Sequence, residues 1–252
     1  MEENKPKIIF LTFGAGSSNY HDAVNRICNQ AKMFDLFDNI YGFTEVDLMN
    51  DNDFWTKHSK FILNNKKGYG YWIWKGHLIK KVMEKANYGD IVIYVDSGCE
   101  LNIRGKQRLL EYFDLVRQYK SLYFQMVHKE KTYSKMSLIK HLNLSENDID
   151  EGHLVCGIQL YEKTDENMFF LNELNELYCH NNYEFVNDSP SIIMNDITFR
   201  DHRHDQSCLS CLCKKYKRKY ILNDETWFQN WNDGINYPIF AVRNRGGKSH
   251  LY

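Results

Sequence analysis

Five consecutive apolar residues, Ile91–Val95, are followed directly by the acidic residue Asp96. An uninterrupted apolar run of this length, preceded by the turn residues Gly89 and Asp90, is typical of a strand buried on both faces, as in a parallel sheet covered by helices. Parallel neighbours cannot be joined by tight turns, because each connection has to cross the sheet and usually contains a helix. The run therefore predicts an α/β chain in which strands and helices alternate.

The rest of the sequence follows this alternation. Apolar runs predict strands at residues 7–13, 40–43, 91–95, 122–127 and 157–161. Apolar residues at helical spacing predict helices at residues 20–34, 74–86, 104–119, 167–178 and 206–216. The chain has only three prolines and no linker rich in Ser, Gly or Pro, so we expect one domain over residues 1–252. The expected fold is α/β, with a mostly parallel central sheet flanked by helices.

Charge and cysteine content exclude several classes of protein. The formal net charge of −1 provides no overall field that would attract nucleic acid or an anionic membrane. No stretch reaches the roughly 18 apolar residues that a membrane-spanning helix needs. The seven cysteines are scattered, and the N-terminal MEENKPK lacks the apolar core of a signal peptide. These features predict a cytoplasmic protein with at most peripheral membrane contact and no nucleic-acid partner.

Asp96 is the first candidate for chemistry. Its expected place is the carboxyl end of a buried strand, where open α/β sheets bind their ligands. Hard carboxylate oxygens suit Mg²⁺ or Mn²⁺, particularly where the ion also contacts phosphates. We therefore expect Asp96 to be a metal ligand, and the alternative is that its carboxylate caps a turn or a helix.

Residues 68–102 carry a longer pattern. A segment rich in Gly, Tyr and Trp ends in Trp-Lys and opens a helix, the helix leads to a Gly-Asp turn, and the next strand ends at Asp-x-Gly. The pattern resembles small GT-A glycosyltransferases of bacterial surface-polysaccharide clusters and large DNA viruses. The residues that carry the resemblance are Trp72, Trp74, Lys75, Gly89, Asp90, Asp96 and Gly98.

The resemblance implies a GT-A fold and a glycosyltransferase of polysaccharide biosynthesis. Such an enzyme moves a hexose-type sugar from a nucleotide-diphosphate donor to a glycan or another hydroxyl acceptor, assisted by Mn²⁺ or Mg²⁺. A UDP-sugar is the expected donor because the enzymes it resembles mostly use uridine diphosphate.

The chain departs from this family at Gly98, where many GT-A enzymes carry a second Asp. The position of Gly98 belongs to the expected metal site, but its carboxylate is missing. The resemblance implies that Glu100, a C-terminal group or the donor diphosphate completes the ion's ligand shell. Ser97, between Asp96 and Gly98, is expected to contact the donor.

Residues 199–216 contain a second similar segment, with His204, Asp205, Gln206 and Ser207 at the expected start of a late helix. Related retaining enzymes carry an Asp-Gln pair beside the anomeric carbon. The resemblance implies that Asp205 is the acceptor base or an orienting group and that Gln206 faces the anomeric centre. The alternative role of Asp205 is a helix N-cap.

Lys75 is expected at the N-terminus of the helix that follows Trp74. A cation there is unfavourable unless an anion lies opposite it, because the helix dipole is already positive at that end. A donor diphosphate would supply the anion, so we expect Lys75 to contact the donor. The alternative is an exposed lysine that covers apolar surface with its stem.

The two ends of the chain complete the expected site. The loop after the first strand resembles the family's nucleoside-binding loop, with Thr12 and Tyr20 as candidates. The C-terminal residues form a Gly-rich basic segment, in which the resemblance implies that Arg243 and Arg245 bind the diphosphate and His250 binds the metal. The alternative is a frayed basic terminus.

A zinc site is less consistent with the sequence. Zinc-binding residue types occur at His202, His204, Cys208, Cys211 and Cys213, but their spacing fits no standard finger, and buried core thiols are the better interpretation.

Two rival functions stay open. One is a Rossmann-type nucleotide-binding enzyme that uses the GAGSS loop, residues 14–18, and the other is a non-catalytic module that binds nucleotide sugars.

Overall fold

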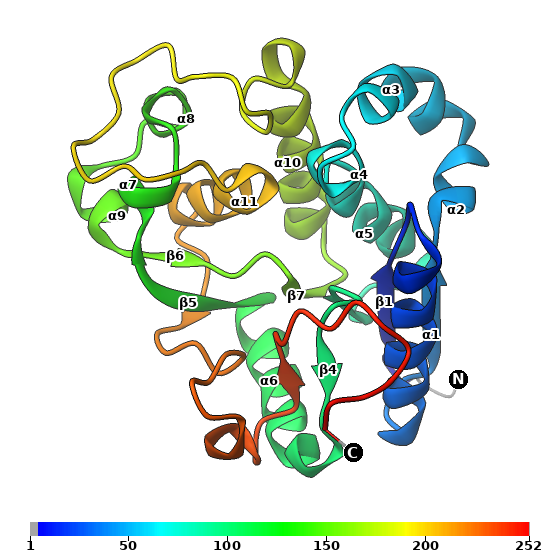
Figure 1. Ribbon diagram of the computed structural model, residues 1–252. Coiled ribbons are helices and arrows are strands. Elements are labelled where there is room, and N and C mark those ends of the chain that lie inside the picture. The colour runs from blue at the N-terminus through cyan, green and yellow to red at the C-terminus, as the bar shows by residue number, and fades with distance from the viewer. Residues whose placement is uncertain (1–4, 252) are drawn as a thin grey trace.

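The computed structural model describes residues 5–251, and within them seven strands form the central sheet. The strands lie in the order β2, β1, β3, β7, β5, β6, and β8 also pairs with β5 (Figure 1). Their bounds are β1 Ile8–Phe13, β2 Asn39–Phe43, β3 Ile91–Val95, β5 Ser121–Lys129, β6 Gly152–Leu154, β7 Ile158–Glu162 and β8 Tyr220–Ile221. A separate two-stranded sheet joins β4, Glu100–Leu101, to β9, Ile239–Phe240.

The central sheet is mostly parallel, as the sequence predicts. β1 pairs in parallel with β2 and with β3. β7 is antiparallel to both β3 and β5, so β5 runs in the direction of β3, and β8 is parallel to β5. Only β7 and β6 run the other way.

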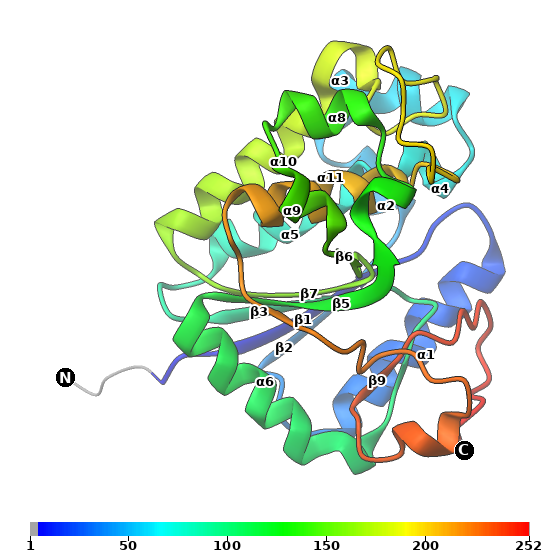
Figure 2. The same cartoon turned by 90° about the vertical axis from the view of Figure 1, so that its left-hand side faces the viewer.

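Helices cover both faces of the sheet, and Figure 2 shows α1 and α6 on one face and α5, α10 and α11 on the other. The longer helices are α1 Ser18–Met33, α3 Asn52–Asn64, α5 Trp74–Lys85, α6 Lys106–Tyr119, α10 Asp165–Tyr183 and α11 His204–Lys215. Shorter ones are α2 Glu45–Met49, α4 Gly68–Tyr71, α7 Glu130–Tyr133, α8 Met136–His141 and α9 Glu146–Asp150, with 3-10 turns at Ile103–Gly105 and Trp231–Gly234.

Strand β3 shows why helices have to cover both faces of the sheet. Ile91, Ile93 and Val95 pack into the core under α1 and α6. Val92 and Tyr94 belong to the core under α5, α10 and α11. All five side chains are buried, and each contributes about 1.5–3 kcal/mol relative to exposure to water.

All the strands and helices expected from the sequence are present, with ends that differ by a few residues. The prediction missed the helices between residues 45 and 71 and between 130 and 150. In α3 the buried stripe is Phe54, His58 and Ile62, so a polar residue interrupts the apolar spacing. No helix in residues 5–251 is long and apolar enough to cross a membrane.

The reversed direction of β7 matters for the site. Ile158, its first residue, pairs with Val95, the last residue of β3. The segment that precedes β7 therefore lies beside Asp96, at the carboxyl end of β3. The main-chain N–H of Asp96 donates to the carbonyl of Gly157 at 2.7 Å, which fixes this contact.

Candidate active site

Asp96 follows the last residue of β3 and remains accessible, with 39% of its side chain exposed. Side chains alternate between the two faces of a strand, so Tyr94 lies on the same face two residues earlier. Its hydroxyl donates to Asp96 Oδ1 at 2.5 Å. The carboxylate is therefore oriented by the protein and still able to contact a ligand.

Lys75 is buried rather than exposed, with 3% of its side chain accessible. Its Nζ lies 2.8 Å from Asp205 Oδ2 and 3.3 Å from Asp96 Oδ1. Burial alone would lower the pKa of Lys75, but the carboxylates of Asp205 and Asp96 outweigh it and hold this pKa well above its usual value. The amine is thus a cation between two anions.

The argument from the helix dipole required an anion opposite the cation, and in the structure two protein carboxylates lie there. The expected contact of Lys75 with a donor stays a prediction, and the alternative of an exposed lysine is wrong. We call Asp96, Lys75 and Asp205 the carboxylate–lysine cluster.

Asp205 lies in the first turn of α11, and Arg203 rather than Asp205 occupies the N-cap position. The Asp205 carboxylate accepts a hydrogen bond from the Cys156 thiol at 3.1 Å in addition to its ion pair with Lys75. Burial and the neighbouring Asp205 raise the pKa of Cys156 well above its usual value, so the thiol keeps its proton and donates. The N-cap interpretation of Asp205 is therefore wrong.

The two segments that carry the family resemblance also meet through aromatic rings. His204 packs against Trp72 with ring centroids 5.7 Å apart and against Tyr71 at 5.0 Å. Residues 68–72 form a left-handed turn, with positive φ at every position, including Tyr69, Tyr71 and Trp72. Each non-glycine residue in that conformation costs about 1–2 kcal/mol.

Tertiary contacts hold this strained turn in place. The indole N–H of Trp74 donates to the carbonyl of Gly68 at 3.0 Å. A Cβ on Gly68 would lie 2.3 Å from the Trp72 ring, so only glycine fits there. Backbone strain that the surroundings maintain in this way is commonly found at functional sites.

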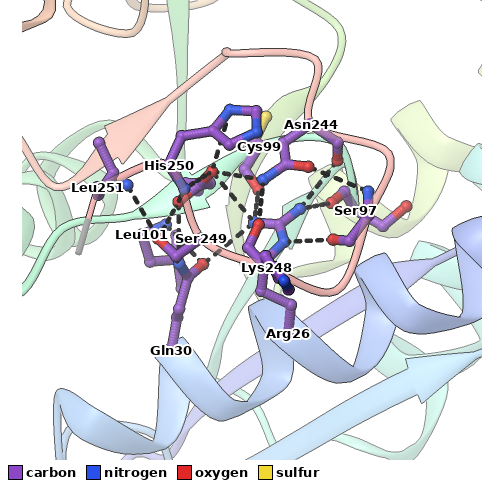
Figure 3. Close-up of polar contacts among 12 residues, drawn as sticks. Arg26, Gln30, Ser97, Cys99, Leu101, Asn244, Lys248, Ser249, His250 and Leu251 are labelled. Carbon is purple, nitrogen blue, oxygen red and sulfur yellow. Dashed lines mark hydrogen bonds and ion pairs between the residues drawn. The ribbon is translucent and has the colours of Figure 1, made fainter.

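A second buried cluster fixes the C-terminal segment, residues 241–251, beside the loop that follows β3 (Figure 3). Arg26 of α1 donates to four main-chain carbonyls. Two belong to the loop, at Ser97 (2.8 Å) and Cys99 (2.9 Å), and two to the C-terminal segment, at Asn244 (2.9 Å) and Gly246 (2.8 Å). The basic C-terminus is therefore bound to the body of the protein, and the frayed-terminus alternative is wrong.

Glu100 completes this second cluster from β4. Its side chain is 0% exposed and accepts from Asn244 Nδ2 at 2.6 Å, from the His250 main-chain N–H at 2.9 Å and from the Ser249 hydroxyl. Burial would raise the pKa of Glu100, but these hydrogen bonds and the nearby Arg26 lower it, so the group is a carboxylate. With its oxygens occupied by the protein, Glu100 is not available to a metal ion.

The expected metal site of Asp96, Gly98 and His250 is not assembled by protein side chains alone. His250 is 65% exposed, and its ring Nδ1 lies 3.8 Å from Glu100 Oε1. Across residues 5–251 no three His, Cys, Asp or Glu side chains are grouped so that they could hold a metal. The exposed Asp96 carboxylate fits one ligand position of Mg²⁺ or Mn²⁺, which often takes most of its other ligands from phosphates and water.

The residues expected to bind the donor differ in their exposure to solvent. Arg243 and Arg245 are exposed on the C-terminal segment, and the Arg245 guanidinium lies 5.8 Å from the centre of the Tyr20 ring. Thr12 is buried inside β1, between β2 and β3, and Ser97 is buried with its carbonyl bound to Arg26. The side chains of Thr12 and Ser97 are thus enclosed by the protein, and their expected contact with a donor stays a prediction.

Gln206 and the α11 cysteines are placed as follows. The Gln206 amide lies 3.2 Å from the thioether sulfur of Met126, which is a weak acceptor. Cys208, Cys211 and Cys213 are buried within the apolar core, as the core-thiol interpretation predicts.

Arg26 and Cys156 are site residues that the sequence analysis missed. Arg26 and Gln30 are spaced by four residues and lie on the buried side of α1 with Ala23 and Ile27. Two polar residues at that spacing on an otherwise apolar stripe are a signal that could have been found. Cys156 offers no such signal, because its partners are distant in the sequence.

Comparisons with known proteins identify the fold. No protein-family model and no curated protein sequence matches the chain. Among solved structures, a glycosyltransferase involved in the glycosylation of the major capsid of the virus PBCV-1 aligns with a TM-score of 0.52 and 10% identity, over 93% of this chain and 92% of that chain. Mouse xyloside xylosyltransferase 1, in its apo form, aligns with a TM-score of 0.48 and 12% identity, over 92% of this chain and 96% of that chain. The first likeness shows that the chain has a GT-A glycosyltransferase fold.

The contacts of Glu100 predict that the C-terminal segment, residues 241–251, detaches more easily when this carboxylate is lost. Glu100→Gln removes a buried carboxylate that accepts from Gln30, Asn244, Ser249 and His250, and breaking such a buried charged network costs about 3 kcal/mol. We expect a lower melting temperature and rapid tryptic cleavage after Arg243 and Arg245, measured by limited proteolysis and mass spectrometry. Glu84→Gln, at an exposed ion pair on α5, is the control. Equal cleavage rates in the two variants would show that Glu100 does not hold the segment.

Proposed function

We propose that this protein is a glycosyltransferase that moves a hexose-type sugar from a nucleotide-diphosphate donor to a hydroxyl of a glycan or another acceptor. The observation that carries the proposal is the carboxylate–lysine cluster at the carboxyl edge of a GT-A sheet. Ligands of open α/β sheets bind at that edge. A UDP-sugar is the first donor to test, on the strength of the sequence resemblance.

On the donor side, Asp96 would hold a divalent ion together with the donor diphosphate. That ion, Mn²⁺ or Mg²⁺, would supply positive charge to the leaving group. The exposed Arg243 and Arg245 add positive charge on the same side, because the C-terminal segment runs over the loop that contains Gly98. Charge that stabilises the departing diphosphate accelerates transfer.

On the acceptor side, Asp205 is the residue that receives the proton. Its Oδ2 is bound to Lys75 and Cys156, while Oδ1 has no hydrogen-bond partner among residues 5–251. The acceptor oxygen bonds to the anomeric carbon, the bond from that carbon to the diphosphate breaks, and the hydroxyl proton passes to Asp205 Oδ1. The neighbouring Gln206 amide faces the anomeric centre.

We further propose that the reaction takes place in the cytoplasm as a step of polysaccharide biosynthesis. All seven cysteines are free thiols, which suits a reducing compartment. A Rossmann-type nucleotide-binding enzyme is the weaker hypothesis, because it leaves the carboxylate–lysine cluster without a role. A module that binds nucleotide sugars without turnover has one observation in its favour, the missing carboxylate at Gly98.

Asp96→Asn tests the metal-binding role. The substitution removes ligand charge with little change in volume, so Mn²⁺-dependent release of nucleotide from UDP-sugars should be lost while the melting temperature stays near the wild-type value. Asp114→Asn, at an exposed carboxylate on α6, is the control and should be fully active. Unaltered activity of Asp96→Asn excludes Asp96 from the site, and wild-type activity in EDTA excludes the metal.

Gly98→Asp tests the missing carboxylate. A Cβ at Gly98 would lie 3.7 Å from the Arg243 Cα, which is an ordinary contact, so the side chain can be accommodated. If Asp96 binds the ion, a second carboxylate should lower the Mn²⁺ concentration for half-maximal activity about tenfold, equivalent to about 1.4 kcal/mol. Gly98→Ala provides the same Cβ without charge and should leave that concentration unchanged. An equal response of both variants to Mn²⁺ would contradict the prediction.

Asp205→Asn separates chemistry from donor binding. Transfer should fall about a hundredfold or more, the usual range for losing a general base or a key electrostatic group. Donor affinity, measured by isothermal titration calorimetry, should stay near the wild-type value because Asp205 does not contact the diphosphate in this scheme. A variant with normal specific activity and a lower melting temperature would instead assign Asp205 a structural role.

A further inference from the structure

Asp188 lies in the segment between α10 and α11, outside the carboxylate–lysine cluster, and 54% of its side chain is exposed. Its Oδ1 accepts from Lys67 Nζ at 3.0 Å, and its Oδ2 accepts from the Tyr71 hydroxyl at 2.7 Å. Burial would raise the pKa of Asp188, but Tyr71 and Lys67 outweigh it and lower this pKa, so the group is a carboxylate at neutral pH. The Nε2 atom of His204 lies 3.7 Å from Asp188 Oδ1.

The hydrogen bonding of His204 fixes which ring nitrogen carries the proton. Its Nδ1 lies 2.7 Å from the Val186 carbonyl, which can only accept, so Nδ1 is the donor. Burial is the largest influence on His204 and lowers its pKa, so the ring is neutral near pH 7. In the neutral ring Nε2 then has a lone pair, and no donor from residues 5–251 reaches it. The side chain is only 7% exposed, so this unpaired atom belongs to a buried group.

Two hydrogen-bond acceptors therefore face each other. His204 Nε2 and Asp188 Oδ1 are 3.7 Å apart, and neither has a hydrogen to give the other. A group with two donors, one for each acceptor, would satisfy both atoms. The vicinal hydroxyls of a sugar ring are such a group, and a single water molecule is the simpler occupant.

Of the two hydrogen-bond acceptors, His204 Nε2 and Asp188 Oδ1, the first lies next in the chain to the residue proposed to act in sugar transfer. His204 directly precedes Asp205, the residue proposed to receive the acceptor proton. Tyr71, His204 and the neighbouring Trp72 all have positive φ and pack against one another, so the protein maintains strained backbone around the pair. Strain held in this way orients side chains for a ligand.

We infer that Asp188 and His204 form the acceptor-sugar subsite, in which vicinal hydroxyls of the glycan acceptor donate to the Asp188 carboxylate and to His204 Nε2. This inference rests on the proposed function.

Asp188→Asn is the decisive variant, because the new amide can donate to His204 Nε2 and closes the pair without changing its size. With an active donor and acceptor in hand, the acceptor KM should rise about tenfold or more, as expected for losing a hydrogen bond to a charged group. The kcat at saturating acceptor and the hydrolysis of the donor without acceptor should stay within about twofold of wild type. Asp114→Asn is the matched control and should change none of these values. An unchanged acceptor KM in Asp188→Asn overturns the inference, as does a fall in donor hydrolysis that matches the loss of transfer.

A binding experiment tests the subsite without turnover. Protein labelled with ¹⁵N-histidine is titrated with methyl hexopyranosides, and with tetrahydropyran, which has the same ring but no hydroxyls. The glycosides should shift the His204 Nε2 resonance upfield, tetrahydropyran should not, and Asp188→Asn should abolish the response. His204→Asn assigns the resonance, since Asn tolerates positive φ.

The two experiments distinguish a failure of the proposed function from a failure of the inferred subsite. If no nucleotide sugar is turned over but the glycosides still shift Nε2 in an Asp188-dependent way, the proposed function fails and the diol-binding site stands. If transfer is observed and no glycoside shifts Nε2, the pair holds only water and the inference is overturned.

Discussion

The buried ammonium group of Lys75 is the interaction on which the arrangement of the site depends. It comes from the first turn of α5 and contacts Asp96 after β3 and Asp205 in α11. Without this cation, two carboxylates from distant parts of the chain would approach each other in a poorly solvated region, where like charges repel strongly. Lys75 therefore allows the protein to bring its acidic groups together before any ligand arrives.

The same cation links two helices on one face of the sheet to the carboxyl end of β3. α5 and α11 cover one face, and β3 contributes to the cores on both. Cys156 and Gly157, which precede the antiparallel β7, lie at this edge of the sheet, and a Cβ on Gly157 would lie only 2.7 Å from Asp96 Oδ2. Packing thus limits the orientation of the Asp96 side chain on one side. Its other side stays exposed to solvent, so the carboxylate can still contact a ligand.

How much of the fold and of the candidate site can be predicted from the sequence depends on how far apart in the chain the interacting residues are. The Ile91–Val95 strand and the position of Asp96 are predictable, because an apolar run and its end are local features. The partners of Lys75 are not, because Asp205 is far along the chain and the dipole argument says only that an anion is needed. Thr12 lies inside the strand predicted at residues 7–13, but its complete burial depends on neighbouring elements that no local motif encodes. The acceptor pair of Asp188 and His204 depends on the Val186 carbonyl, a main-chain contact that no motif encodes.

Arg26 has a consequence for how such a protein can diversify. Two of the four carbonyl oxygens that it binds belong to the C-terminal segment, so this part of the attachment does not depend on the segment's side chains, whereas Asn244 and Ser249 also bind Glu100 through theirs. The exposed Arg243, Arg245 and Lys248 can be exchanged while the backbone stays anchored beside the loop after β3. Charge and shape at these exposed positions can therefore change on an anchored backbone, and a library confined to them would test the proposed donor-binding role of the segment.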